Sequence, residues 1–196
     1  MPLSTFANLK AAIADWCHRT DLTTQILDFV ALSEAQIRRD VRCRAQQIIV
    51  TVTLTGEVLA QPTRYIEAER LVLEDVEQDF VAPGMYAQLQ QAQSTEPKYT
   101  HIGTDLYILN GANGSAYSLL YWQQFTPFSA DSDSNWLLLN APEIYLSGAL
   151  VQAAVYLNDD AMLTRHAAIY QASVKMLNNS ERRAQFSGSR LEIRAN

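Results

Sequence analysis

The spacing of apolar residues changes twice along this chain, and that change constrains the fold more than any other feature. Before residue 46 and after residue 136, apolar residues recur every three or four positions, which is typical of amphipathic helices. From Gln46 the period becomes two, and the segment Ile48–Thr55 is rich in β-branched residues. The pattern therefore predicts a chain that leaves a helical bundle, forms a β unit and returns to the bundle.

Two helices are expected in the first 45 residues. The first begins after Ser4 or Thr5, and its apolar face includes Phe6 and Ile13. The second runs from about residue 23 to residue 42 and has a charged face of mixed sign. A short turn joins them, so we expect the two helices to pack antiparallel.

The stretch from Asn135 to Leu150 marks the return to the bundle. Pro142 suits the first position of a helix, because an N–H group there would have no partner within the helix. Gly148 and the neighbouring alanines are small, so we expect another helix to approach the backbone closely at this point. A last helix follows and ends near Asn178.

Residues 46 to about 128 predict a compact β unit of short strands. Strands are expected at 48–54, 70–73, 99–102, 105–109 and 116–122, with a short helix at 85–93. Residues 56–57 are expected to form a turn after which residues 58–60 pair back. Residues 110–114 read as a turn.

The predicted fold class is α+β, a four-helix bundle with an inserted small β domain and an extended C-terminal tail. The expected bundle comprises residues 1–45 and 138–180, the inserted β domain with its linker comprises 46–137, and a flexible basic tail comprises 181–196.

The charge is uneven between this tail and the remainder of the chain. The net charge is −6, and residues 181–196 carry four arginines against two glutamates, which leaves −8 on the rest. A body this acidic is not expected to grip nucleic acid, because phosphate binding needs a basic surface. The basic tail either docks elsewhere or is a solvated terminus.

No residue pattern predicts catalysis, a metal site or a cofactor. The three histidines and two cysteines lack ligand spacing, and no glycine-rich phosphate loop occurs. No signal peptide and no apolar run long enough to span a membrane are recognised, so we expect a protein kept in a reducing cytoplasm. We expect a structural protein, not an enzyme.

Four stretches of the chain point to a family. They are residues 9–22, residues 29–42, residues 135–150 and residues 186–191, which occur in the expected order and span both ends of the chain. On these stretches the chain resembles the head-to-tail connector adaptor proteins of short-tailed, podovirus-like bacteriophages.

The resemblance implies a ring, typically of twelve subunits, that lies beneath the portal protein and offers a platform to the tail or tail-nozzle proteins. DNA would pass through the ring without specific binding, and no membrane is involved. The protein would reside in the virion connector, and in the host cytoplasm during assembly. By the same resemblance, portal binding is carried over to the C-terminal segment, on Arg182, Arg183, Arg190, Leu191, Ile193 and Arg194.

Two other functions stay open at this stage. One is a monomeric stopper or tail-completion protein. The other is a small hydrolase carried with the tail, which would need a cluster of histidine, aspartate and serine that no spacing in the sequence predicts.

Overall fold

A computed structural model describes residues 3–73 and 75–186. The chain divides into two compact units. The first, here called the helical unit, contains the chain up to Ala45 and from Phe125 onward, and the second, the sheet unit, contains Gln46–Gln124. Each unit has a separate buried core, so each is described by itself.

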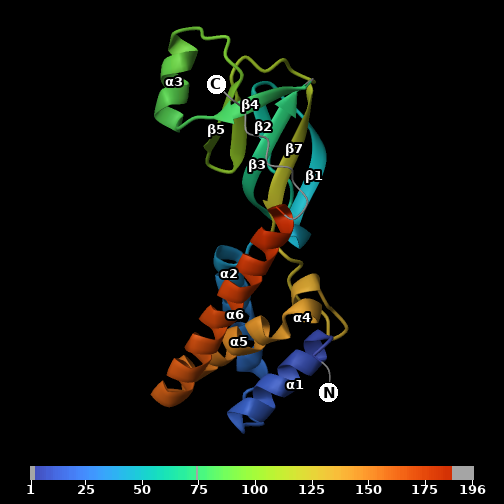
Figure 1. The fold of residues 1–196 in the computed structure, drawn as a ribbon, viewed down its shortest axis with the longest axis vertical. Coiled ribbons are helices and arrows are strands. Elements are labelled where there is room, and N and C mark those ends of the chain that lie inside the picture. The colour runs from blue at the N-terminus through green and yellow to red at the C-terminus, as the bar shows by residue number, and fades with distance from the viewer. Residues whose placement is uncertain (1–2, 74, 187–196) are drawn as a thin grey trace. The chain divides into compact units, whose positions relative to one another are not determined.

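Both ends of the chain build the helical unit. Its helices are α1 (Phe6–Cys17), α2 (Thr23–Asp40), α4 (Trp136–Asn140), α5 (Pro142–Leu157) and α6 (Asp160–Phe186). Helix α5 contacts each of the other four, and Figure 1 shows it between α6 and α1. The unit is therefore organised around a central helix that begins at Pro142, as the sequence predicts.

The sheet unit contains seven strands and one helix among its described residues. They are β1 (Gln47–Thr53), β2 (Val58–Ala60), β3 (Tyr65–Leu73), β4 (Val76–Phe80), α3 (Pro83–Gln91), β5 (Lys98–Ile102), β6 (Asp105–Ile108) and β7 (Ala116–Gln123), and a single 3₁₀ turn, Arg44–Gln46, precedes β1. The strand order is β1-β7-β3-β4-β5-β6-β2, and the pairs are antiparallel except β4 with β5.

The sheet curls until it is nearly closed and barrel-like. Its two edge strands, β1 and β2, are consecutive in the chain and contact each other. The buried side chains inside are Leu54, Leu59, Tyr65, Leu71, Tyr99, Leu106, Ile108, Tyr117, Leu119 and Tyr121. A curled sheet of this kind buries one face of every strand, which gives the unit a core of its own.

The expected fold class, a four-helix bundle with an inserted small β domain and an extended tail, is wrong. Six helices and a nearly closed seven-stranded sheet occupy the described residues. Strand β4 has the sequence VEQDF, and its acids hide the alternation that reveals a strand. Residues 181–186, expected in the tail, continue helix α6 instead.

The segment between β7 and α4 is fixed to the helical unit by aromatic and polar contacts. Phe128 stacks on Phe6 and contacts Tyr145, with ring centroids 5.1 and 5.0 Å away. The backbone N–H of Phe128 donates to Glu34 Oε1 at 3.1 Å. Asn135 caps α4 by accepting from the Leu138 N–H at 3.0 Å. These contacts hold the returning chain against α1, α2 and α5.

Helices α2, α5 and α6 approach one another closely at Gly148. A Cβ atom added to Gly148 would lie 2.3 Å from Ser33 Oγ on α2 and 3.3 Å from a ring carbon of Tyr170 on α6. Both neighbours are buried, so neither can move away into solvent. The expectation of a close helix approach at this glycine is confirmed.

We predict that Gly148→Ala lowers the free energy of unfolding by about 1–3 kcal/mol, because the new methyl group overpacks the contact. Chemical denaturation measures the change. The double variant Ser33→Ala with Gly148→Ala should recover part of the loss, since it removes the nearest atom.

Gly84→Ala is the matched control for this prediction. Gly84 lies in the first turn of α3, and an added Cβ there would have no heavy atom within 4 Å. This change should leave the stability equal or raise it by up to about 1 kcal/mol, since alanine favours helix. Equal losses in both variants would contradict the packing argument.

The Glu34 carboxyl gives the helical unit a predictable pH dependence. Burial raises its pKa from 4.5 to about 7, although the hydrogen bond from the Phe128 N–H acts in the opposite direction. The folded state therefore holds a proton that the unfolded chain releases at lower pH, so this group lowers stability as pH rises from 4.5 to 7.

We predict that Glu34→Gln removes this part of the pH dependence. Because Glu34 is partly exposed, the variant should gain on the order of 1 kcal/mol over the wild type near pH 8 and almost nothing near pH 5. Urea unfolding at both pH values measures it. Glu143→Gln, at an exposed acid of α5, should leave the wild-type pH profile in place; an unchanged profile in the Glu34 variant would contradict the assignment.

Candidate functional site

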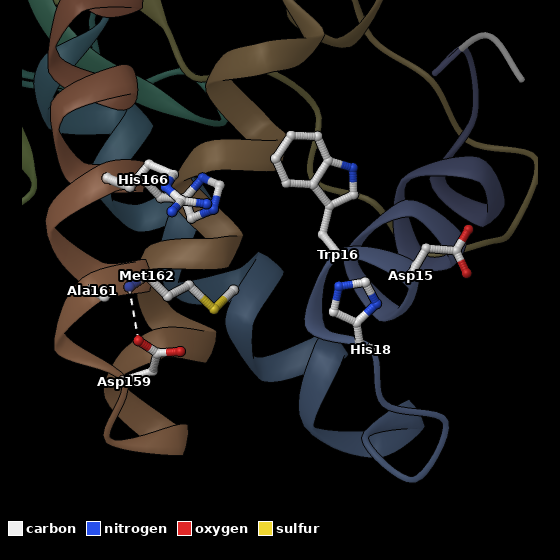
Figure 2. A pocket seen from close by; sticks show the side chains of 8 residues that line it. Asp15, Trp16, His18, Asp159, Ala161, Met162 and His166 are labelled. Carbon is white, nitrogen blue, oxygen red and sulfur yellow. Dashed lines mark hydrogen bonds between the residues drawn. The ribbon is translucent and has the colours of Figure 1, made fainter.

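An open groove of about 540 Å³ lies in the helical unit, between the end of α1 and the start of α6. Figure 2 shows Asp15, Trp16 and His18 on the α1 side and Asp159, Met162 and His166 on the α6 side. The Trp16 ring is half exposed and meets His166 edge-on, with ring centroids 5.5 Å apart. This groove is a candidate site for catalysis or ligand binding.

The groove lacks the parts of a catalytic site among the described residues that line it. Burial lowers the pKa of His166, and the nearby Arg165 lowers it further, so its imidazole is neutral at pH 7. Asp159 accepts the backbone N–H of Met162 at 2.8 Å and so caps α6. No serine, threonine or cysteine lines the groove to act as a nucleophile.

The two cysteines do not supply a nucleophile or a metal site either. Burial raises the pKa of the Cys17 thiol more than nearby Arg19 lowers it, which disfavours the reactive thiolate. Cys43 is fully buried. Across residues 3–73 and 75–186, no group of three or more metal-ligating side chains comes together.

A cluster of arginines is the most distinctive surface of the helical unit. Four hydrogen bonds fasten the segment after α2 to the end of α6. Arg42 N–H donates to Asn178 Oδ1 at 3.0 Å, Asn178 Nδ2 donates to the Asp40 carbonyl at 2.8 Å, and Arg44 donates to Glu181 from its backbone at 2.9 Å and its side chain at 3.2 Å.

The two segments that this docking joins carry six arginines. They are Arg38, Arg39, Arg42 and Arg44 from α2 and the segment after it, and Arg182 and Arg183 from α6. We call them the arginine cluster. Two carboxylates occur in the same segments: Asp40 accepts from the Tyr170 hydroxyl at 3.0 Å and Glu181 accepts from Arg44. By count, the cluster has six cationic side chains and these two carboxylates.

The ionised carboxylate of Glu181 stabilises the docked segment. Burial opposes ionisation of Glu181, but the backbone and side-chain hydrogen bonds from Arg44 outweigh burial and lower its pKa. Its side chain is 14% exposed, so this charge pair is partly shielded from solvent.

Sequence reasoning found part of this surface and missed the rest. Arg182 and Arg183, two of the residues expected to bind the portal, lie exposed on the last turns of α6. The other four, Arg190, Leu191, Ile193 and Arg194, lie outside the described residues. Of the four arginines in residues 38–44, the sequence assigns Arg38 and Arg39 to the charged face of the second helix, and nothing in it shows that this segment meets α6.

The net charge of the chain is distributed unequally between the two units. The sheet unit has nine carboxylates and three cationic side chains, whereas the rest of the chain has twelve of each. The whole net charge of −6 therefore belongs to the sheet unit. Within the rest of the chain, the charge of +2 on residues 181–196 balances a charge of −2 on residues 1–45 and 125–180.

These observations define a class of protein: one built of two compact units that differ in net charge, in which no metal-ligating cluster forms among the described residues. The match to a family model is consistent with that class. The model described as SU10 adaptor protein matches residues 4–194, nearly the whole chain, so the chain belongs to the SU10 adaptor protein family.

Membership of this family confirms part of the function that the sequence predicts. The protein is a structural adaptor of bacteriophage virions, and the family is a structural, non-enzymatic one. The resemblance to phage head-to-tail adaptors is thus confirmed, while its restriction to short-tailed phages stays a prediction. No curated protein matches the chain. In the part of the chain that the structure describes, no helix is long and apolar enough to cross a bilayer.

We predict that Asn178→Ala destabilises the helical unit by about 1–2 kcal/mol, because it removes both the acceptor for Arg42 and the donor to Asp40. Asn179→Ala, at the exposed next position of α6, shares the change in helix propensity and serves as the control. Denaturation of both variants gives the difference, and equal stabilities would contradict the role of Asn178 as the clamp.

Proposed function

We propose that this adaptor forms a ring beneath the portal in the head-to-tail connector of a short-tailed phage. The ring, of twelve subunits, joins the portal to the tail or tail-nozzle proteins and lets DNA pass. The observation that carries the proposal is the family match over residues 4–194, and the exposed arginine cluster supports a docking role.

The portal contact is assigned to the arginine cluster together with the segment that follows α6. Arg182 and Arg183 belong to the cluster, and Arg190, Leu191, Ile193 and Arg194 follow in the sequence. Arginine suits this role because its guanidinium forms paired hydrogen bonds with carboxylates at protein interfaces. The partner surface on the portal is therefore acidic.

The charge distribution supports passage of DNA without capture. The sheet unit has a net charge of −6, which disfavours binding of phosphates, and the rest of the chain is neutral as a whole. The arginine cluster holds six of the twelve cationic side chains outside the sheet unit, and the portal covers it.

We predict that the purified chain mixed with its portal forms a ring on the portal with the portal's rotational symmetry. Electron microscopy of the mixture measures this directly. A single bound copy, or a chain that stays monomeric with portal present, would instead identify a stopper or tail-completion protein. Hydrolysis of a cell-wall substrate by the wild-type chain would identify the tail-associated hydrolase.

Variants of the arginine cluster test the proposed contact. Arg182→Ser with Arg183→Ser should weaken portal binding at least about tenfold and reduce its dependence on salt. Removal of residues 187–196 should weaken it as well. Lys175→Ser, at an exposed cation on α6 outside the cluster, is the control and should bind normally. Normal binding after both cluster changes and truncation would overturn the assigned contact.

A further inference from the structure

Two large apolar side chains lie exposed along one side of helix α6. Ile169 is 39% exposed and Met176 is 73% exposed, and they are seven residues, or about two turns, apart. Ala172, between them, is exposed as well, and the exposed Arg165 borders the stripe about one turn before Ile169. We call these four residues the α6 face. Apolar residues at this spacing form the stripe through which a helix packs on a neighbour.

Helix α2 exposes a second apolar face. Leu27 is 45% exposed and Leu32 is 54% exposed, and the exposed residues Ala31 and Ala35 lie between them around the helix. Asp28 is exposed on the same side. We call these five residues the α2 face. The two alanines leave room between the leucines for larger side chains from another helix.

The two faces point away from each other within one chain. Asn178 of α6 donates to the Asp40 carbonyl at the end of α2, and Ile169 lies on the opposite side of α6, because it precedes Asn178 by about two and a half turns. By the same count, Ala31 lies opposite Asp40, whose carboxylate accepts from Tyr170 of α6. The faces cannot meet within one copy. Neighbouring copies of a ring, however, join through two different surfaces.

The charges of the two helices are complementary. Residues 23–37 of α2 include two acids and no lysine or arginine, whereas residues 161–180 of α6 include two cations and no acid. On the faces themselves, Asp28 and Arg165 have opposite signs. Contact between two α2 faces or between two α6 faces would bring like charges together, so the charges favour a contact between unlike faces.

We propose that the α6 face of one copy packs on the α2 face of the next copy around the ring. Ile169 and Met176 lie against the alanines of the α2 face, and Asp28 pairs with Arg165 across the contact. The inference rests on the proposed function, since it names the surfaces through which the copies of the proposed ring meet. The residues assigned to the portal contact belong to neither face.

The direction of the helices suits this packing. Ser33 and Tyr170 both meet Gly148, and farther along each helix Asp40 meets Asn178, so α2 and α6 run in the same direction within a chain. Rotation by one-twelfth of a turn changes this direction little, so the paired faces run nearly parallel, as helices in close contact commonly do. One helix pair buries a small area, so we expect the copies to associate on the portal and not free in solution.

Cysteine cross-linking on the portal tests the pairing of the faces. One chain carries Ala31→Cys and another carries Ile169→Cys, both with Cys17→Ser because the native Cys17 is partly exposed. After the mixture has assembled on the portal, a short thiol-reactive cross-linker should give dimers that contain one chain of each kind. Either variant alone should give none, because two copies of the same face do not meet.

Gln171→Cys, used in place of Ile169→Cys, is the matched control. Gln171 is exposed, but it lies two residues after Ile169 and therefore on another side of α6. It should give at most about a tenth of the cross-linked dimer, since its side chain faces away from the contact.

The charge pair gives an independent test. Asp28→Arg should leave fewer copies on the portal in electron micrographs, and Arg165→Asp in the same chain should restore them. A wild-type chain that forms no ring on the portal would overturn the proposed function and this contact together. A wild-type ring without cross-links between Ala31→Cys and Ile169→Cys, cross-links no stronger than in the control, or a full ring with Asp28→Arg would overturn the contact alone.

Discussion

The close approach of α2 and α6 to α5 at Gly148 is the contact on which the helical unit depends. At this glycine, side chains from α2 and α6 reach the backbone of α5 from two sides. Because α2 precedes the sheet unit and α6 follows it, the contact joins segments separated by more than a hundred residues. The helical unit therefore needs segments from both sides of the sheet unit, and the returning segment is fixed to it by the contacts of Phe128 with Glu34 and Tyr145.

The same long-range closure creates the surface that distinguishes this protein. Residues 38–44 carry four arginines, and α6 adds two more only because Asn178 and Glu181 bind the segment after α2. These segments hold six arginines and the two carboxylates of Asp40 and Glu181. The sheet unit differs, because it carries the net negative charge of the chain. This difference in charge between the two units is compatible with membership of a family of structural adaptors.

Much of the helical architecture could be predicted from local pattern. Helix α1 begins after Thr5, α5 begins at Pro142, and the small residues of α5 mark a close contact. The sheet was underestimated, because the acids of β4 obscure its alternation, whereas the pairing of residues 58–60 was expected. The arginine cluster was half predicted: Arg182 and Arg183 stood out in a basic C-terminal stretch, whereas Arg38 to Arg44 looked like an ordinary solvated helix end.

The sequence by itself determined the helical and strand periods, the glycine at the helix crossing and the family to which the chain belongs, since these depend on residues near one another in the chain or on their order. Tertiary structure decided the near closure of the sheet and the docking of residues 41–44 on α6. Each of these depends on contacts between segments distant in sequence, and the free energy of such contacts comes from burial and hydrogen bonding that no local pattern encodes.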